Sequence, residues 1–364
     1  MRPHKIALIR GDGIGPELVD AATTVLAAVT AHGEYSVEYV EIDAGADTYR
    51  RTGTACAAAN VELMRSGVDA TLKGPVGLPQ VRLPDGTEAG VLGGILRTGL
   101  DLYANIRPIS LLPGIGSALA GRAPGEIDYV IVRENTEGLY AARGKGVGNR
   151  WAVADTMMTT REGTARVCRR AFDLARSRAR GRKVTCVDKS NVLRGHVLFR
   201  EVFTEVAEGY PDIATEFCYA DAAAQALVLR PDEFDVLVME NLLGDVLSDL
   251  GGATVGGISV CPSGNIGDHG AYFEPIHGSA PALAGRGLAN PVGQLLAAAM
   301  MLDHLGHHRD GDTLREAVST ALLRGAVRIA PDGSAAGGPE AVAEAVVNVI
   351  TETGGGPARE RDGA

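Results

Sequence analysis

Apolar and polar positions alternate along this chain in two rhythms, one typical of strands and one of helices. Short runs rich in Val, Ile and Leu predict strands, and longer runs with apolar residues three or four apart predict helices. In chain order we expect strands at 5–10, 36–41, 70–73, 129–133, 184–189 and 236–240, and helices at 16–30, 55–66, 161–179 and 196–209. Strands that alternate with helices in this way are typical of an α/β protein with a largely parallel sheet.

The last of these strands leads into a Gly-flanked helical stretch, 241–249, that carries Asp245 and Asp249. Residues four apart share a helix face, so the two carboxylates repel by about 0.2 to 0.5 kcal/mol unless a cation lies between them. Hard divalent cations prefer such oxygen ligands. A solvated surface pair is the alternative, but five apolar residues leave little of this helix to face water: Leu242, Leu243, Val246, Leu247 and Leu250. We therefore predict a Mg²⁺ or Mn²⁺ site.

Length and charge narrow the class of protein. The 364 residues suffice for two domains of roughly 100 to 200 residues each, with a cleft between them. A hydrophobic content of 45% and a charged content of 22% are ordinary for a globular enzyme. The formal net charge of −10 argues against nucleic acid as the main partner. Only the Gly-rich tail, 354–364, has the composition of a disordered segment.

Cysteine usage and hydropathy favour a reduced, cytoplasmic setting. The five cysteines are scattered and form no CxxC pair, as expected of a protein without disulfides. The first strand-like run is interrupted by charge, so we expect no signal peptide. The apolar run at 295–302 is far shorter than the roughly 20 residues that a membrane helix needs. No membrane partner is expected.

The stretch 139–154 interrupts the alternation of strands and helices. It is rich in Gly and Arg and contains the one tryptophan of the chain, Trp151. Tryptophan is enriched at protein interfaces and is unfavourable when fully exposed. The stretch is therefore either a surface loop or an arm that grips a second subunit.

Three arginines lie in nearly apolar surroundings, namely Arg97, Arg107 and Arg133. A buried guanidinium needs a partner, and its planar fork suits a carboxylate. The partner could be an anionic ligand. Alternatively, the three arginines form internal salt bridges with residues such as Asp101 or Glu134, since buried ion pairs occur without function.

The strand 184–189 ends in Lys189, and Asn191 follows it. Strand ends of this kind face the cleft in open α/β sheets. A lysine at such a position can have its pKa lowered and act as a base, although a surface lysine is the simpler interpretation.

Two further segments consist of small residues. Positions 11–16 follow the first strand, where a dinucleotide fingerprint would lie, but Pro16 stands in place of the last glycine; that template favours a tight turn over nucleotide contact. The loop 274–281 contains His277, and Asn290 follows it. Small residues permit close approach to a ligand and Asn can pair with an adenine edge, but a turn-rich connection would look the same.

Together these segments resemble the β-decarboxylating dehydrogenases, the family of isocitrate, 3-isopropylmalate, homoisocitrate and tartrate/D-malate dehydrogenases. The resemblance runs from Gly11 to about Leu305, and it is most specific in four strings: Leu102 to Pro108, Arg133 to Tyr140, Asn241 to Asp249, and Glu274 to Asn290. It implies a two-lobed isopropylmalate dehydrogenase-like fold in place of the classical Rossmann fold. Residues 1–103 with 256–364 would form the cofactor-binding lobe, 104–255 the dimerising metal and substrate lobe with its arm, and the cleft between them the active site.

The resemblance also implies roles for the matching residues in the oxidative decarboxylation of a 3-substituted malate to a 2-oxo acid and CO₂. Four residues would bind this small anionic substrate: Arg97, Arg107, Arg133 and Asn191. Three would hold Mg²⁺ or Mn²⁺, which acts as a Lewis acid on the substrate: Asp221, Asp245 and Asp249. Lys189 would take the hydroxyl proton and Tyr140 would protonate C3. Lys189 and Asp221 would come from the partner subunit, so a homodimer would share its active sites.

The cofactor implied by the resemblance is NAD. Its adenosine side would lie along six residues: Glu274, His277, Gly278, Ser279, Ala280 and Asn290. Ala282 occupies the position where NAD-specific members carry Asp, and where NADP-specific bacterial isocitrate dehydrogenases carry Lys followed by Tyr. Neither the Asp nor the Lys-Tyr pair is present, so we expect NAD. NADP is the alternative, because Arg286 is near.

The resemblance leaves the C3 substituent of the substrate open. The segment 90–97 lacks the Glu and Leu residues of isopropylmalate enzymes, the Ser and Asn of isocitrate enzymes and the Arg of homoisocitrate enzymes. Gly93 and Gly94 cost roughly 1 kcal/mol each within a helix, so the room they leave has a use. The strings Arg133 to Tyr140 and Pro262 to Gly267 look closer to the homoisocitrate and isocitrate branch. Two alternatives remain: a specialised-metabolism member acting on a phosphonate or aryl analogue of isocitrate, and a non-catalytic regulatory subunit, which would have lost residues that this chain retains.

Overall fold

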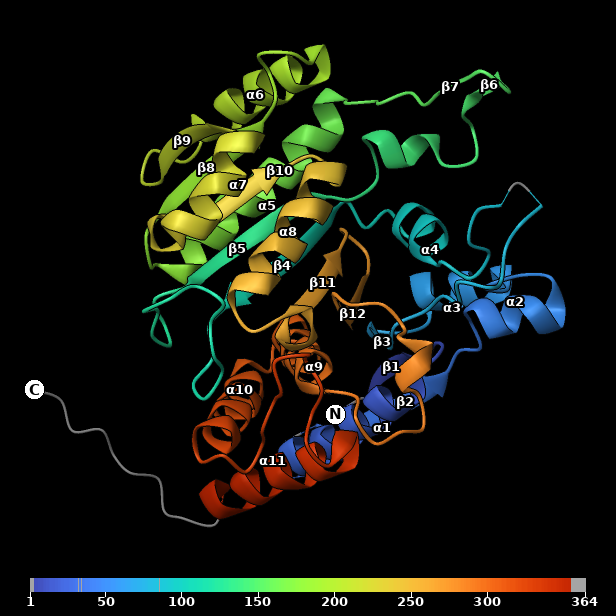
Figure 1. The fold of residues 1–364 in the computed structure, drawn as a ribbon, viewed down its shortest axis with the longest axis vertical. Helices are drawn as coiled ribbons and strands as arrows, with labels where there is room; N and C mark the ends of the chain where they lie inside the picture. Colours follow the sequence, from blue (N-terminus) through green and yellow to red (C-terminus); the bar gives the residue numbers. More distant parts are fainter. Residues whose placement is uncertain (1–2, 32, 34, 85, 355–364) are drawn as a thin grey trace, which may run out of the picture.

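The computed structural model describes residues 3–31, 33, 35–84 and 86–354. The tail predicted to be disordered falls almost wholly on 355–364, outside the described residues. Within the described part, one ten-stranded sheet runs through the molecule in the order β2-β1-β3-β12-β11-β4-β5-β10-β8-β9 (Figure 1). Its strands are β1 (His4–Ile9), β2 (Val37–Glu41), β3 (Ala70–Lys73), β4 (Ala104–Ser110), β5 (Asp128–Glu134), β8 (Lys183–Asp188), β9 (Ala214–Tyr219), β10 (Val236–Met239), β11 (Pro262–Ile266) and β12 (Ala271–Pro275).

The sheet is mostly parallel, which confirms the predicted fold class. Six neighbouring strand pairs among the described residues are parallel. The three antiparallel pairs lie together at the centre and join β12, β11, β4 and β5. One half of the sheet takes its strands from both ends of the chain, and the other half, from β4 to β9, takes its strands from the middle segment. The two ends of the chain therefore share one side of the molecule.

All six predicted strands are present, within one residue or so of their expected bounds. Four strands of the ten-stranded sheet were not predicted: β4, β9, β11 and β12. β4 and β11 carry polar residues and proline in the sequences ANIRPIS and PSGNI, so they lack an apolar run. β9 is an exposed edge strand. The polar side chains of the central strands belong to the site described below.

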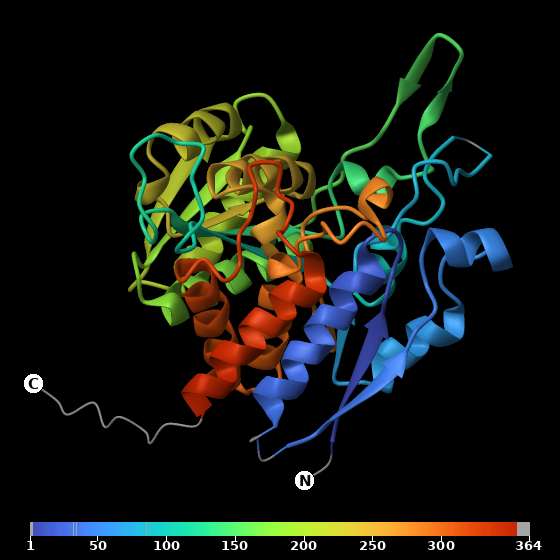
Figure 2. The same cartoon turned by 60° about the horizontal axis from the view of Figure 1, so that its bottom comes forward.

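Helices cover the sheet on both halves: α1 (Gly15–Thr30), α2 (Ala46–Thr52), α3 (Ala58–Ser66), α4 (Gly93–Gly99), α5 (Arg161–Arg178), α6 (Arg194–Ala207), α7 (Ala220–Leu229), α8 (Asn241–Thr254), α9 (Val292–His304), α10 (His308–Leu323) and α11 (Gly338–Gly354). α9 is buried against β3, β11 and β12, and α1 packs beside α11 outside it (Figure 2). On the other half, α8 packs against β4 and β5 and lies in front of the sheet in Figure 1, while α5 packs against β5, β8 and β10.

The predicted helices correspond to α1, α3, α5 and α6, and the predicted helical stretch 241–249 corresponds to α8. α3 begins three residues later than expected, because Cys56 instead forms a β-bridge with Ala44. Side-chain caps fix two helix starts near the site. Thr160 accepts a hydrogen bond from the Gly163 amide at the start of α5, and the Glu240 carboxylate accepts bonds from the first amides of α8. Within the described residues, no helix has the length and apolar character of a membrane span.

The stretch 139–154 forms a projecting hairpin. After the short 3₁₀ helix η1 (Leu139–Ala142), strands β6 (Val147–Asn149) and β7 (Ala152–Ala154) pair with each other and leave the body of the molecule (Figure 2). Three apolar side chains of this hairpin are exposed, with fractions of 69% for Val147, 80% for Trp151 and 72% for Val153. Exposed apolar side chains on a projecting element are typical of an interface.

Candidate active site

A cavity of about 750 Å³ lies where the two halves of the sheet meet. Its walls come from β3, α4 and the end of β12 on one side, and from β4, β5, η1 and α8 on the other. Eight of the predicted site residues line it: Arg97, Arg107, Arg133, Tyr140, Asp245, Glu274, His277 and Gly278. The structure therefore brings together side chains that are far apart in the sequence.

The floor of this cavity is the polar face of the central antiparallel strands. Side chains two positions apart point to the same face of a strand, which places Asn105 beside Arg107 on β4. The Arg107 Nε donates to Asn105 Oδ1 at 2.5 Å, and Asn105 Nδ2 donates to Asn265 Oδ1 at 2.6 Å. Asn265 Nδ2 in turn donates to Glu274 Oε1 at 3.2 Å. This chain of buried amides holds Arg107 and Glu274 in fixed positions.

Three guanidinium groups converge above this floor. The Arg133 side chain is 1% exposed, and its Nε and Nη2 donate to Asn241 Oδ1 at 3.0 and 2.7 Å. Arg133 Nη1 is ion-paired with Asp245, and Arg107 Nη2 lies 3.3 Å from Asp245 Oδ1. Burial, together with the neighbouring guanidiniums, lowers the pKa of Arg133 and Arg107. Positive charges that are crowded in this way favour an anionic ligand.

The internal salt bridges considered as an alternative do form, but with Glu274 and Asp245; the two partners named for them are wrong. Asp101 is paired with Arg166, whose Nη1 lies 2.6 Å from its carboxylate. Glu134 accepts hydrogen bonds from the backbone amides of Thr136 and Glu137. Neither carboxylate is therefore paired with the three arginines.

Asp245 and Asp249 lie on one face of α8, as predicted. Burial alone would raise the pKa of Asp245, but Arg133 and Arg107 outweigh it and lower that pKa below its ordinary value. Burial raises the pKa of Asp249, whose nearest cation is Arg107 at 3.8 Å. The prediction that the apolar residues of this helix are shielded from water is wrong at Val246, which is 59% exposed. In the single chain, Val246 therefore lies on the surface of α8.

The two carboxylates fit a hard divalent cation through their oxygen chemistry. One chain does not complete such a site, because no group of three His, Cys, Asp or Glu residues able to hold a metal exists among the described residues. The third predicted ligand, Asp221, is instead ion-paired with Lys189 at 2.8 Å. A further ligand would therefore have to come from outside this chain.

Lys189, Asn191 and Asp221 do not line the cavity of their own chain. Lys189 and Asn191 lie in the turn between β8 and α6, and Asp221 lies in the first turn of α7. The carboxylate of Asp221 is 72% exposed. This second group of predicted residues is thus on the surface, available to another molecule.

The predicted cofactor residues divide into two sets. Glu274, His277 and Gly278 line the cavity, and burial lowers the pKa of His277, whose Nε2 is buried without a hydrogen-bond partner. An unpartnered buried ring nitrogen suits a polar ligand. Ser279 and Ala280 do not line the cavity. The Ser279 carbonyl oxygen lies so close to Gly13 that a Cβ added to this glycine would stand 2.0 Å from it. The glycine turn 11–16 therefore packs directly on this loop.

Asn290 does not line the cavity. Its Oδ1 accepts a hydrogen bond from the Val292 amide at 3.0 Å, and its Nδ2 donates to Ser259 Oγ at 3.1 Å. The side chain thus holds the start of α9.

Lys73 is a site residue that the sequence did not reveal. It ends the apolar strand β3, is 3% exposed, and its ammonium group is ion-paired with Glu274. Arg97 Nη2 lies 3.6 Å from the same carboxylate. The pattern that drew attention to the arginines, a cation at the end of an apolar run, also applies to Lys73 and could have found it.

Glu274→Gln is expected to reduce the free energy of unfolding by about 3 kcal/mol at pH 7, because it leaves Lys73 buried and unpaired. Burial opposes ionisation of Glu274, but Lys73 and Arg97 outweigh it and lower the pKa from 4.5 to about 2. A carboxyl group whose pKa is lower in the folded state stabilises the fold at pH values above its unfolded-state pKa. This stabilisation is lost as the pH falls towards the folded-state pKa. Urea denaturation at one protein concentration should therefore give a difference between wild type and variant that shrinks below pH 4.5.

The control for this variant is Glu352→Gln, which removes an exposed partner of Arg324. It should change the free energy of unfolding by less than about 0.5 kcal/mol. A difference between Glu274→Gln and wild type that stays constant from neutral to acidic pH would contradict the electrostatic explanation.

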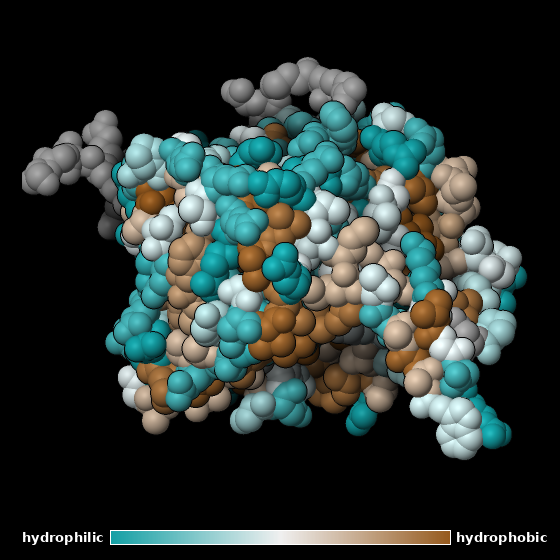
Figure 3. Space-filling model, turned by 90° about the horizontal axis from the view of Figure 1, so that it is seen from above, coloured by the Kyte–Doolittle hydropathy of each residue, from teal (hydrophilic) through white to brown (hydrophobic). Residues whose placement is uncertain are grey.

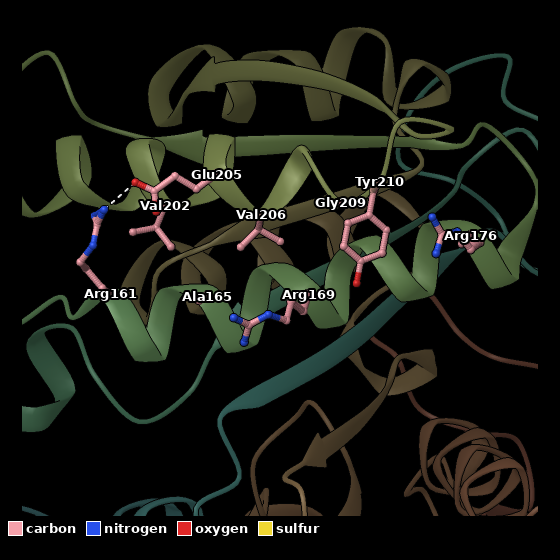
Figure 4. A pocket seen from close by; sticks show the side chains of 9 residues that line it. All are labelled: Arg161, Ala165, Arg169, Arg176, Val202, Glu205, Val206, Gly209 and Tyr210. Atoms are coloured by element: carbon pink, nitrogen blue, oxygen red, sulfur yellow. Dashed lines mark hydrogen bonds and ion pairs between the residues drawn. The ribbon is translucent and has the colours of Figure 1, made fainter.

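A second cavity, of about 530 Å³, lies between α5 and α6 on the outside of the molecule (Figure 4). The Arg161 guanidinium and the Glu205 carboxylate form an ion pair at one end of it, and Tyr210 lies towards the other end. None of the predicted site residues lines this cavity. It is therefore not the candidate active site.

The sequence profile of the isocitrate/isopropylmalate dehydrogenase family matches residues 5–332. A 3-isopropylmalate dehydrogenase of Corynebacterium efficiens is 44% identical over 322 residues, which cover 86% of this chain and 92% of the relative. An isocitrate/homoisocitrate dehydrogenase of Thermus thermophilus is 42% identical over 350 residues, which cover 95% of this chain and 98% of the relative.

Solved structures give the same result. An isocitrate dehydrogenase from Methylococcus capsulatus superposes with a TM-score of 0.85 at 38% identity, covering 95% of this chain and 99% of that one. A β-decarboxylating dehydrogenase from Thermococcus kodakarensis superposes with a TM-score of 0.77 at 38% identity, covering 96% of both chains. The similarity thus extends over the whole fold that carries the cavity.

Proposed function

The chain belongs to the isocitrate/isopropylmalate dehydrogenase family of β-decarboxylating dehydrogenases, and we propose that it oxidises and decarboxylates a 3-substituted malate with reduction of NAD⁺. The products are a 2-oxo acid and CO₂. The observation that carries this proposal is the convergence of the Arg97, Arg107 and Arg133 guanidiniums, the Asp245 carboxylate and the Tyr140 hydroxyl on one cavity. Asp249 does not line the cavity but lies one helix turn from Asp245, 3.8 Å from Arg107. Each of these groups matches a different need of the reaction.

Arg97, Arg107 and Arg133 bind the malate carboxylates. Guanidinium forks pair with carboxylates through two parallel hydrogen bonds and so orient the substrate as well as hold it. Burial strengthens this binding because the cavity wall excludes water. The surplus of positive charge described above is then neutralised by the substrate.

Tyr140 and Lys189 move the protons. Lys189 of the partner subunit would take the C2 hydroxyl proton, and bound NAD⁺ would supply the acceptor for the hydride of C2. The bond from C3 to its carboxylate then breaks, CO₂ departs, and the Tyr140 hydroxyl protonates C3. Burial and the hydrogen bond to Asp245 Oδ2, at 2.6 Å, raise the pKa of Tyr140 and keep it in the acid form that this step needs.

Asp245, Asp249 and the Asp221 of the partner would hold Mg²⁺ or Mn²⁺. A bound ion would supply Lewis-acid polarisation of the substrate oxygens. Tyr140 and the arginines already contact Asp245, so this carboxylate also aligns the substrate groups with the proton donor.

The cofactor would lie against Glu274, His277 and Gly278, with Ser279 and Ala280 in the same loop and Asn290 at the start of α9. The unpartnered His277 Nε2 supports this assignment. With Ala282 in the discriminating position, we propose NAD over NADP. Residues 1–103 and 256–364 form the cofactor-binding lobe, and 104–255 form the metal and substrate lobe.

A homodimer with shared active sites is supported by the apolar surface of the second lobe. Besides the hairpin, exposed apolar side chains include Phe217, Leu229 and Val246, and the surface seen from above carries apolar patches among hydrophilic residues (Figure 3). All five cysteines are free, which agrees with a cytoplasmic setting. The relatives described above favour neither a phosphonate- or aryl-specialised enzyme nor a regulatory subunit.

The test is reduction of NAD⁺ and NADP⁺ with Mn²⁺ against isopropylmalate, isocitrate, homoisocitrate, D-malate and tartrate. We expect efficient turnover of at least one malate, with NAD⁺ preferred and with loss of activity in EDTA. Metal binding without turnover of any malate would contradict the proposal and favour the regulatory subunit.

A further inference from the structure

Arg143 is an exposed cation that lines the candidate active site. Five cationic side chains line the cavity: Lys73, Arg97, Arg107, Arg133 and Arg143. The first four each lie within 4.0 Å of the carboxylate of Glu274 or Asp245. Among the described residues Arg143 has no ion-pair partner, although Asp155 lines the same cavity. Within the part of the chain that the structure describes, the one hydrogen bond of the Arg143 side chain runs from Nη2 to the backbone oxygen of Glu88, at 3.1 Å.

Arg143 lies close to Tyr140, the residue proposed to protonate C3 of the substrate. It follows η1 directly, three residues after Tyr140, and its amide donates to the Tyr140 carbonyl oxygen at 3.2 Å. The Tyr140 and Arg143 side chains both line the cavity. Because Tyr140 delivers the proton to C3 under the proposed function, Arg143 lies beside the group that C3 carries.

The opposite wall of the cavity leaves room for that group. The bond to Glu88 ties Arg143 to the segment that leads into α4, where Gly93 and Gly94 line the cavity. A Cβ at Gly94 would meet nothing within 4 Å, and one at Gly93 would meet only the Arg97 side chain, at 3.8 Å. Two apolar residues, Val76 and Val91, also line the cavity and suit a methylene stem.

We propose that Arg143 binds an acidic group at the end of the C3 substituent, and hence that the substrate is a malate with three acidic groups. The inference rests on the proposed function and deepens it by naming the substrate class. Guanidinium offers five N–H donors, of which Arg143 uses one within the chain. The cation for a distal acid thus comes from the segment after η1, not from the helix that carries Arg97.

The experiment compares kcat/KM for five malates in wild type and in Arg143→Gln, Arg143→Lys and Arg328→Gln. The C3 substituents are carboxymethyl, carboxyethyl, phosphonomethyl, isopropyl and hydrogen. The Arg328 guanidinium also donates to a backbone carbonyl, at 3.1 Å, but does not line the cavity, so it serves as the matched control.

In wild type, at least one acid-terminated malate should exceed isopropylmalate in kcat/KM. Arg143→Gln should lower kcat/KM for the acid-terminated malates by about 10- to 100-fold, the value of a charged hydrogen bond, while hydrogen and isopropyl substituents should be affected less than about threefold. Arg143→Lys should recover part of the loss. The carboxylate and phosphonate substrates then identify which acid the site receives.

Two results would overturn the inference while leaving the proposed function intact. One is an equal loss on all five malates in Arg143→Gln, which would mean that Arg143 only supports η1 and Tyr140. The other is a wild-type preference for isopropylmalate. Absence of turnover of every malate, in contrast, would overturn the proposed function and the inference with it.

Discussion

Asp245→Asn is expected to lower kcat by about 1,000-fold while the chain stays folded. The Asp245 carboxylate contacts three side chains of the site. It is ion-paired with Arg133, lies 3.3 Å from Arg107 Nη2 and accepts a hydrogen bond from the Tyr140 hydroxyl at 2.6 Å. Asparagine has the same shape and keeps an oxygen for Tyr140, but it removes the negative charge. The metal site would lose a charged ligand, and the crowded guanidiniums would lose their counter-charge.

The measurement is steady-state turnover on the substrate identified above, together with Mn²⁺ titration and a thermal melt. Asp268→Asn is the matched control, because Asp268 also accepts a tyrosine hydroxyl bond, from Tyr103 at 2.9 Å, but lies outside the cavity. It should leave kcat and Mn²⁺ affinity unchanged. If Asp245→Asn kept more than about a tenth of wild-type turnover, a metal role for Asp245 would be excluded.

Tyr140→Phe and Lys189→Met should each inactivate the enzyme by about 100- to 10,000-fold, the range for loss of a general acid or base. Co-expressed, they should regain about a quarter of wild-type activity, because half of randomly formed dimers are mixed and each mixed dimer has one intact site. The intact site would combine Tyr140 of one subunit with Lys189 of the other. The position of Lys189 outside the cavity of its own chain motivates this expectation.

The control pair is Tyr140→Phe with Asp245→Asn. These two residues are hydrogen-bonded within one chain, so every site in a mixed dimer would carry one of the changes, and no activity should return. If the Tyr140→Phe and Lys189→Met pair also failed to regain activity while native mass spectrometry showed mixed dimers, the site would not be shared between subunits.

Elements set by local pattern could be predicted from the sequence. The strand that ends in Arg133 and the helix with Asp245 and Asp249 both appeared where apolar periodicity placed them. A run of apolar residues specifies a buried strand, and a four-residue spacing specifies one helix face, whatever the rest of the chain does. The family resemblance in turn rests on contiguous strings.

Contacts between distant segments could not be predicted in this way. Asn105 and Asn265 are 160 residues apart and meet only because β4 and β11 pair antiparallel in a particular register. Lys73 and Glu274 are 201 residues apart. A polar residue within a strand weakens the apolar pattern, so the strands that build the floor of the site are those that pattern analysis overlooks.

The sequence by itself determined the α/β class and most of the parallel strands, and it singled out the candidate side chains for the chemistry, because these depend on residue type and short spacing. Only the tertiary structure decided which of them share a cavity, since sheet order and register are set by packing over the whole chain. It separated Lys189 and Asp221 from the remaining residues and turned Val246 to the surface. It also placed the unpaired Arg143 beside Tyr140, a relation that depends on how η1 is held against α8 and the segment before α4.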